Sequence, residues 1–545
     1  MLVLNETDIE LLHQPTPPSY ATADWEDPSI ASQRHPGLMV SHGMFMCLTF
    51  FIFLPMGMAL RAVKHRLHGL AVAAQWTCTV LGLASGSLYR KLTPDMYPGQ
   101  SHSRHGYVVL LIALAITSID AAGLLRRLFS FLRAKQFTLR AFSNAFTGHT
   151  DREASEYVGL IGEEVEMDSA EDTKNRNGSF EEAEFTPAFD HGNTEQWASH
   201  VRTHSNVSDG TLFSPASPRS EDTLHDVHFI PRLSILRRMG HVVFSVAEWS
   251  LIFGGFAMFL SGLVVYTGVC RENFVTGCLA HLIKGGIFWS YGLLTFARFL
   301  GFCAELGWSW NRAPSSGYPT AEFVESFVIF LYGVTNTWME RFGASPGDPF
   351  TTKQIQHIGI AVMFWFAGLI GMAVESKTIR RWLAALAVDT SESVAEPVTY
   401  TSSFNPFPAL VIGVTGSVMA AHFQEYLFQV QIHALWGNLL LAFAVMRCVT
   451  YFFLWVSPPS STLPSRPPTE ALASFFLAAG GISFIFSTEE ITFAAMRRGH
   501  DDIMLFVVMA VSSTCIAFCW TVIIISFQGW LKTRTKPTAA YHRSA

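Results

Sequence analysis

Long apolar runs, each close to the length of a membrane span, are the feature that most limits what this chain can fold into. Half of its 545 residues are hydrophobic, and only 15% are charged. A helix needs about 20 mostly apolar residues to cross the hydrocarbon core of a bilayer. The sequence therefore predicts an all-α fold, a polytopic transmembrane helix bundle.

Eleven runs qualify as predicted spans, so we expect about 10–11 transmembrane helices. The run at 323–341 is the weakest because Glu325, Asn336 and Glu340 interrupt it, and the run at 407–422 is short. The predicted spans are Leu38–Leu60, Leu67–Leu88, His105–Leu125, His241–Tyr266, Leu282–Phe302, Phe323–Arg341, Ile355–Ala373, Phe407–His422, Ile432–Leu454, Ala471–Ser487 and Ile503–Phe527.

The positions of Lys and Arg predict which ends of the spans face the cytoplasm, because positive charge in short loops favours that side. Basic residues cluster at 61–66, between the first two spans, and at 126–140, after the third. We therefore expect an extracytoplasmic tail over residues 1–37, which suits the glycosylation sequon at Asn5, and a cytoplasmic tail over 531–545. Arg497 in the last inter-span loop opposes this orientation.

A polar insert separates the third predicted span from the fourth. Residues 151–230 contain 18 Asp or Glu against 5 Lys or Arg and have no sustained apolar period. Such a segment cannot bury enough apolar surface to fold alone. We expect a disordered acidic cytoplasmic loop over residues 130–235, which divides the membrane part into domains at 38–129 and 236–530.

Histidine stands at the start of several predicted spans. A polar imidazole at the mouth of a lipid-buried helix is costly, so it usually pairs, lines a water-filled site or binds something. The alternative is an interfacial histidine that caps a helix and meets lipid headgroups. The residues concerned in the amino-terminal half are His42, His68, His102, His105 and His241.

The sequence around these histidines resembles cytochrome b561 domains, which hold two b-type haems between four core helices through paired histidines. One matching stretch stands in each of four predicted helices, and His65 and His105 are rivals for two of the ligand positions. The stretches are His42-Gly43 with Met46 and Leu54-Pro55-Met56-Gly57 ahead of Arg61, His68 with Gly82, His102 with Gly106, and His241 ahead of Trp249.

This resemblance implies haem b at two levels of the membrane, each bound by imidazoles from two helices. His42 with His102 or His105 would form the extracytoplasmic level, and His68 with His241 the cytoplasmic level. Haems at both levels imply that single electrons pass from a small-molecule donor in the cytoplasm to an outer acceptor, such as ferric iron or an oxidised ascorbate radical.

Beyond residue 241 the sequence resembles the carboxy-terminal domain of fungal Ytp-like integral membrane proteins and, more faintly, the transmembrane protein 45 family. Together with the b561-like half, this likeness covers nearly the whole chain, and it implies no established reaction. The stretches that carry it are His281–Gly292, Arg298–Trp310, Gln356–Gly359, His422–Glu425, His433–Leu435 and Ser487–Glu490.

A second group of polar side chains is expected in the carboxy-terminal half, where the predicted orientation brings several span ends to one leaflet. Imidazoles and carboxylates together suit a divalent metal such as zinc, copper or iron, and within a membrane they equally suit a proton or ion pathway. A hydrogen-bonded network that only joins helices is the third interpretation. The residues are His281, His357, His422, His433, Glu489 and Glu490.

The eight cysteines include one pair, Cys270 and Cys278, that brackets a short inter-span loop. A disulfide and two free thiols are both compatible with this spacing. The sequence contains no nucleotide-binding loop, nucleophile elbow or His-Glu-x-x-His motif, which argues against an ATP-driven pump and against a serine or zinc peptidase of known pattern.

Composition also limits partners and location. The net charge of -6 arises mainly from the acidic insert, which argues against nucleic acid as a partner. We expect a multi-pass protein of the plasma membrane or of the secretory endomembranes, in contact with membrane lipids. Two functions remain open at this point: transmembrane electron transfer, or a metal or small-solute transporter or non-catalytic membrane protein with a metal-binding cluster.

Overall fold

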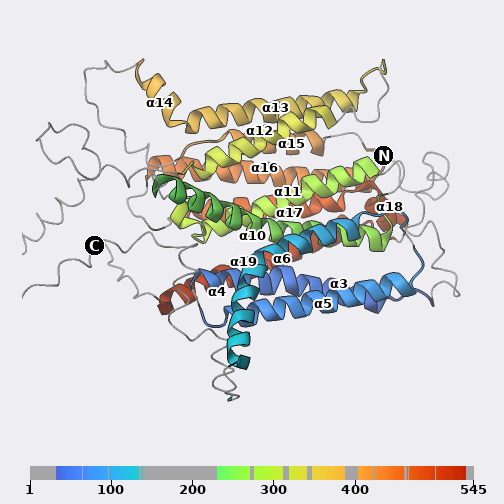
Figure 1. Cartoon of the computed structure of the whole chain (residues 1–545). Helices are drawn as coiled ribbons and strands as arrows, with labels where there is room; N and C mark the ends of the chain where they lie inside the picture. Colours follow the sequence, from blue (N-terminus) through green and yellow to red (C-terminus); the bar gives the residue numbers. More distant parts are fainter. Residues whose placement is uncertain are drawn as a thin grey trace, which may run out of the picture. The chain divides into compact units, whose positions relative to one another are not determined.

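The structure is a computed structural model, and its described part is built from fourteen α-helices with no β-strand, which confirms the predicted all-α fold (Figure 1). The predicted acidic loop at 130–235 and the tail at 1–37 fall mostly outside this part. The described residues are 32–63, 65–95, 97–133, 138, 230–270, 275–310, 318–339, 347–386, 403–421, 424–458, 463, 466–497 and 499–535.

The chain divides into two compact units, one of residues 1–149 and 247–545 and one of residues 150–246. In the second unit, the described residues are the first turns of a single long helix, α10 (Ile230–Thr267). Nearly all described residues therefore belong to the first unit, and so do the described side chains of the sites considered below.

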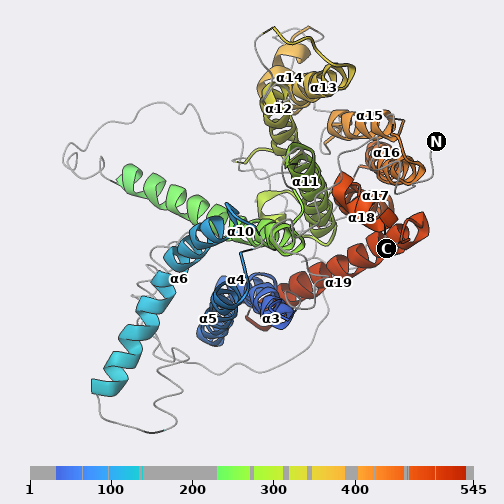
Figure 2. The same ribbon diagram turned by 90° about the vertical axis from the view of Figure 1, so that its right-hand side faces the viewer.

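The amino-terminal half of the first unit consists of long helices that begin close to the predicted histidines. The first span is continuous through α3 (Pro36–Cys47), the π-helical turn η1 (Leu48–Phe53) and α4 (Leu54–Ala62). It packs along α5 (His68–Leu92), and α6 (His102–Arg133) follows (Figure 2). At the end of α4, Arg61 forms an ion pair with Glu248 of α10.

Proline inside the first span leaves a backbone carbonyl without its usual helical hydrogen-bond donor, and a distant helix supplies one. Pro55 has no N–H to donate to the carbonyl of Phe51, four residues earlier. The indole Nε1 of Trp520 donates a hydrogen bond of 2.6 Å to that carbonyl. Because Trp520 lies on α19 (Ile503–Thr535), this contact joins the first and last spans.

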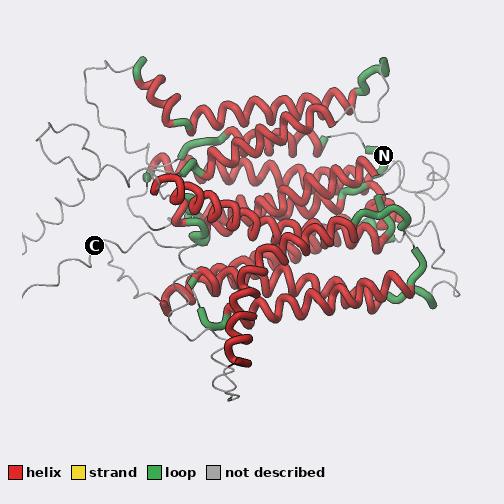
Figure 3. Tube along the Cα trace, in the orientation of Figure 1, coloured by secondary structure: helices red, strands yellow, loops and turns green. Residues whose placement is uncertain are grey.

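The carboxy-terminal half is a bundle in which α17 lies between α11 and α16, while α12 packs on α13 and α15 on α16 (Figures 1 and 3). A short helix, α14, follows α13, and α18 precedes α19. The bounds are α11 (Val275–Phe299), η3 (Ala304–Leu306), α12 (Ala321–Met339), α13 (Thr352–Glu375), α14 (Lys377–Ala384), α15 (Phe407–Ala420), α16 (Leu427–Val456), α17 (Pro468–Phe486) and α18 (Glu489–Arg497).

Small residues allow the helices of this bundle to approach closely. A Cβ added at Gly285 of α11 would lie 2.7 Å from the carbonyl oxygen of Gly481 on α17, and one added at Gly292 would lie 2.6 Å from the backbone nitrogen of Ala478. Glycine at such positions lets helix backbones meet and gain dispersion contacts, which is the usual basis of packing between membrane helices.

Seven helices in the described part are long and apolar enough to cross a membrane: Pro36–Ala62, His68–Leu92, Val243–Thr267, Gln354–Glu375, Leu427–Val456, Pro468–Phe486 and Ile503–Arg534. The other four predicted spans also coincide with helices, α6, α11, α12 and α15. Within the described residues these four are shorter or less apolar. Arg298 of α11 and Glu325 of α12 are among the polar side chains that these helices bury.

Candidate functional site

Two of the predicted haem ligands, His42 and His102, lie next to each other near the starts of α3 and α6. Their ring centroids are 6.2 Å apart and their planes are inclined by 82°. His105, the rival of His102, is exposed one turn further along α6. The structure therefore pairs His42 with His102.

Both imidazoles are held by hydrogen bonds at Nδ1. His42 Nδ1 donates to the carbonyl of Gly82 at 2.7 Å, because a carbonyl can only accept. His102 Nδ1 lies 2.8 Å from Oγ of Ser261, and the Ser261 hydroxyl donates to the carbonyl of Met258, so its oxygen accepts from His102. In this arrangement Nε2 of each ring carries the lone pair that a metal requires.

Glycine on α5 brings that helix close to the His42 ring. A Cβ added at Gly86 would lie 2.7 Å from His42 Nδ1, so a larger residue would displace the imidazole. On the other side, a Cβ at Gly262 would lie 3.3 Å from the His102 ring. Because Gly86 and Gly262 have no side chain, the two imidazole rings have space to lie next to each other.

The separation of this pair fits a single metal between two ring nitrogens. A metal–nitrogen distance of about 2 Å on each side, plus about 1 Å from each nitrogen to its ring centre, gives roughly 6 Å between centroids. His102 also borders a mostly apolar cavity of about 1140 Å³ that extends to Arg298 and Glu325. His42 does not border this cavity. The donor set of two neutral imidazoles fits a bis-imidazole haem.

Of the two predicted ligands of the second haem, only His68 has a described side chain. His68 Nδ1 donates to the carbonyl of Gly57 at 3.0 Å, the same arrangement as that of His42 with Gly82. Position 241 lies on α10, and the side chain of His241 lies outside the described residues. The pairing of His68 with His241 therefore stays a prediction.

A second pair of imidazoles forms in the carboxy-terminal half, where His281 of α11 faces His433 of α16. Their ring centroids are 6.1 Å apart and their planes are inclined by 82°. Each Nδ1 donates to a carbonyl one turn earlier in its own helix, His281 to Gly277 and His433 to Gln429, both at 2.8 Å. The ring separation and inclination of the amino-terminal pair are thus repeated, whereas His433 Nε2 also accepts a hydrogen bond of 3.4 Å from the side-chain amide of Gln424.

The other predicted metal ligands are placed differently. His357 is half-buried near the start of α13, Glu489 is exposed at the start of α18, and His422 lies outside the described residues. Glu490 is buried and accepts a hydrogen bond from the backbone N–H of Cys270. Among the described residues, the group of three or more such donors within ligand distance is Cys270, Cys278 and Glu490, and its two cysteines form a disulfide.

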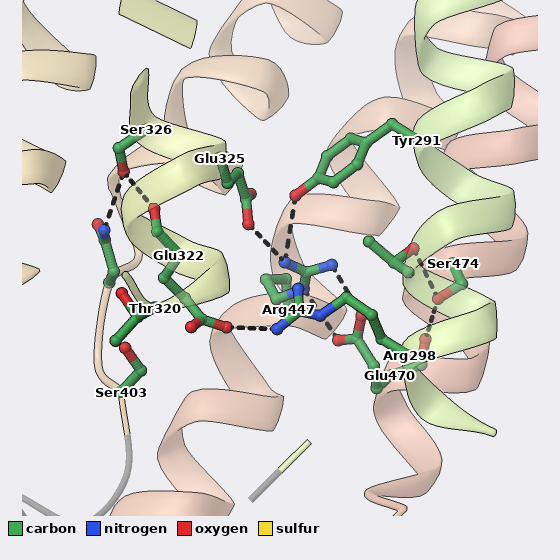
Figure 4. Close-up of polar contacts among 12 residues, drawn as sticks. Tyr291, Arg298, Thr320, Glu322, Glu325, Ser326, Ser403, Arg447, Glu470 and Ser474 are labelled. Carbon is green, nitrogen blue, oxygen red and sulfur yellow. Dashed lines mark hydrogen bonds and ion pairs between the residues drawn. The ribbon is translucent and has the colours of Figure 1, made fainter. Parts of the chain in front are cut away.

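A buried network of charges joins α11, α12, α16 and α17, and the sequence analysis did not identify it (Figure 4). Arg447 donates to both carboxylate oxygens of Glu470, at 2.9 and 2.7 Å, and lies 3.6 Å from Glu325. Arg298 pairs with Glu322 at 2.6 Å. These charges are desolvated, so they persist only because each has an opposite partner close by.

Aromatic side chains complete this network. The guanidinium groups of Arg298 and Arg447 lie 4.8 and 5.0 Å from the ring centre of Trp310, a cation–π arrangement. The Tyr291 hydroxyl accepts a hydrogen bond from Arg447 at 3.4 Å. The sequence contains one signal for this network. Arg447 is the single charged residue inside the predicted span 432–454, and an unpaired charge would be costly there, so a buried partner is expected.

Comparisons with known proteins agree with this architecture of a polytopic, all-helical membrane protein. Residues 254–529 match the family described as protein YTP1-like, C-terminal, and residues 25–125 match a domain of unknown function, DUF2427. The chain belongs to the YTP1-like family of membrane proteins, as its resemblance to Ytp-like proteins predicted.

Two fungal relatives support this assignment. The chain is 30% identical over 518 residues to an uncharacterized membrane protein of Schizosaccharomyces pombe, covering 91% of this chain and 94% of that protein. It is 34% identical over 315 residues to an uncharacterized membrane protein of Saccharomyces cerevisiae, covering 54% of this chain and 49% of that protein. No solved structure matches the chain.

Proposed function

We propose that this membrane protein binds haem b between His42 and His102 and transfers electrons across its membrane. The observation that carries the proposal is the 6.2 Å separation of two imidazoles whose Nδ1 atoms are both engaged in hydrogen bonds. Haem bound in this way supplies reversible one-electron redox chemistry. His68 and His241 are the proposed ligands of a second haem.

The surrounding residues hold the ligands and leave the redox chemistry to the cofactor. Gly82 and Ser261 accept the Nδ1 protons and so fix the tautomer and the orientation of each ring. Gly86 and Gly262 have no side chain, which leaves space for the imidazole rings of His42 and His102. The cavity beside His102 is lined mainly by apolar side chains.

An optical spectrum tests the proposal. Full-length protein purified in detergent should show a Soret band and an α band that sharpens on reduction with dithionite. His42→Ala and His102→Ala should each remove the haem of this level, while His500→Ala, which changes an exposed imidazole after α18, should leave the spectrum unchanged. Monodisperse protein without these bands after haem supplementation would refute the proposal.

The two levels can be separated by comparing variants. We expect His68→Ala to remove about half of the haem absorbance, because two haems would contribute similar bands. His105→Ala should retain both, since the structure pairs His102 with His42. Loss of haem in His105→Ala with retention in His102→Ala would reverse the ligand assignment.

A metal or small-solute transporter is the second candidate function, and the His281–His433 pair favours it. Uptake of metal ions or small solutes into proteoliposomes distinguishes the two functions. Electron transfer predicts reduction of ferric iron or of an ascorbate radical outside vesicles that contain a reductant, with no net solute uptake.

A further inference from the structure

The apolar cavity that borders His102 reaches the buried charge network at its other end. Its lining comes mainly from α10, α11 and α12, and on α11 it includes both Val275 and Arg298. At about 1.5 Å per helical residue, these two positions lie roughly 34 Å apart along the helix. A volume of about 1140 Å³ spread over that length is an elongated space, which suits an extended apolar chain.

One side of α12 places a carboxylate at the network end of this cavity. Glu325 lines the cavity together with Val328 and Ile329, three and four residues later, so all three lie on one side of the helix. The Glu325 side chain is only 7% exposed. Among the described residues, neither of its carboxylate oxygens accepts a hydrogen bond of ordinary length. A buried carboxylate in this state gains from any donor that enters the cavity.

Carboxylates outnumber guanidinium groups in the part of the network that the structure describes. Arg447 pairs with Glu470 and Arg298 pairs with Glu322, so each arginine already has a close counterion. Glu325 is the third carboxylate, and its ion contact with Arg447 is longer, at 3.6 Å. Figure 4 shows Glu325 pointing toward the guanidinium of Arg447, which it shares with Glu470. The network therefore carries one negative charge in excess.

Two further charged groups lie near this end of the bundle. Glu375, at the end of α13, has a cation of its own, since Arg380 lies 3.8 Å away. Lys284 also lines the cavity, but it precedes Tyr291 by about 10 Å along α11, toward the start of that helix. The excess charge thus stays with Glu325.

We propose that the cavity binds a long-chain amine, with its ammonium group beside Glu325 and its chain along α11. A carboxylate in excess inside a membrane protein requires a proton or a cation next to it. An ammonium group supplies the cation together with N–H donors for the carboxylate oxygens, and the apolar lining buries the chain. The proposal does not rest on haem, because Glu325 lies at the end of the cavity remote from His102.

Photo-crosslinking in a lipid bilayer tests the proposal. Full-length protein in phosphatidylcholine nanodiscs is irradiated with an octadecylamine that carries a diazirine in its chain, and the labelled peptides are mapped by mass spectrometry. We expect labels at cavity positions of α10, α11 and α12. Unlabelled octadecylamine should compete at least about tenfold better than octadecanol or stearate, because hydrogen bonds to a charged group add that much affinity.

Substitution of Glu325 separates recognition of the head group from burial of the chain. Glu325→Gln should remove the preference for the amine over octadecanol, and Glu325→Asp should keep part of it. Glu470 still pairs with Arg447 in both variants, so the main ion pair of the network is retained. Asp501→Asn, which changes an exposed carboxylate, should behave as the parent.

A bulky substitution tests the position of the chain. Val328 lines the cavity one turn from Glu325, and the indole of Val328→Trp should fill this space and reduce labelling by every probe. All variants must elute as monodisperse protein with the far-UV spectrum of the parent.

Three results would overturn the proposal. Equal competition by octadecanol, or a preference for the amine that survives in folded Glu325→Gln, would leave a proton on Glu325 as the balancing charge. Better competition by stearate would assign the head group to Arg298 instead. The measurement needs no haem, so absence of haem bands leaves it interpretable, and its own failure leaves the haem proposal untouched.

Discussion

Arg447 and Glu470 form a two-point ion pair between α16 and α17, with Nε–Oε2 and Nη2–Oε1 distances of 2.9 and 2.7 Å. Both side chains are completely buried. Paired geometry of this kind is the strong form of a charge-assisted hydrogen bond. Glu325 and Tyr291 contact the same guanidinium, so one buried arginine connects four helices.

Removing one partner of this pair should destabilise the protein strongly. Glu470→Gln leaves the Arg447 charge without its main counterion, and we expect the free energy of unfolding to fall by about 3–5 kcal/mol. Replacing both residues with Met should cost less, since no charge is then left buried. Thermal unfolding measures both, and Asp501→Asn, an exposed control, should change stability by less than about 0.5 kcal/mol. Equal losses in the single and double variants would contradict the interpretation.

The contact between Trp520 and Phe51 predicts a double-mutant cycle. Trp520→Phe leaves the Phe51 carbonyl without its donor and should cost about 1–3 kcal/mol. Pro55→Ala supplies a backbone N–H four residues after Phe51, so the cost of Trp520→Phe should be smaller in that background. Melting temperatures of the four variants measure the coupling. If the stability changes of the two single variants simply add in the double variant, the Trp520 indole does not compensate for the N–H that Pro55 lacks.

Gly86 should be required for the position of His42. The added methyl of Gly86→Ala would lie 2.7 Å from His42 Nδ1 and displace the imidazole. We expect this variant to lose haem absorbance at the level of His42 while keeping its helical circular dichroism. Gly529→Ala serves as the control because a Cβ there meets nothing within 4 Å. Full haem retention in Gly86→Ala would argue against His42 as a ligand.

The disulfide between Cys270 and Cys278 closes a loop with a sequence separation of 8. A loop of this size should contribute about 2.5 kcal/mol by restricting the unfolded chain. Cys278→Ser should therefore lower stability by that order, and Cys448→Ser, which changes a free exposed thiol, should not. Mass spectrometry after alkylation checks the bond directly.

An introduced cysteine tests the predicted orientation. Ser101 is exposed in the loop before α6, and the Lys and Arg distribution predicts that this loop is extracytoplasmic. In sealed right-side-out vesicles, a membrane-impermeant maleimide should label Ser101→Cys. Cys47, a half-buried cysteine inside the first span, should stay unlabelled. Labelling only after the vesicles are opened would reverse the orientation.

Local features of this protein could be predicted from the sequence, because each depends on one segment alone. Apolar runs of span length predicted helices at all eleven places, since a backbone in hydrocarbon must satisfy its own hydrogen bonds. Histidine near the starts of α3, α5 and α6 was readable in the same way, and so was the membership in the Ytp-like family. The polar insert was recognisable by composition.

Only the tertiary structure decided which of these residues meet. It placed His42 next to His102 rather than His105, and His281 next to His433. It also joined Arg447 to Glu470 and Trp520 to Phe51, across sequence separations of 23 and 469 residues. Hydropathy within one segment records how apolar that segment is. It does not record the partner helix, whose position depends on non-local packing and on the need to pair every buried charge.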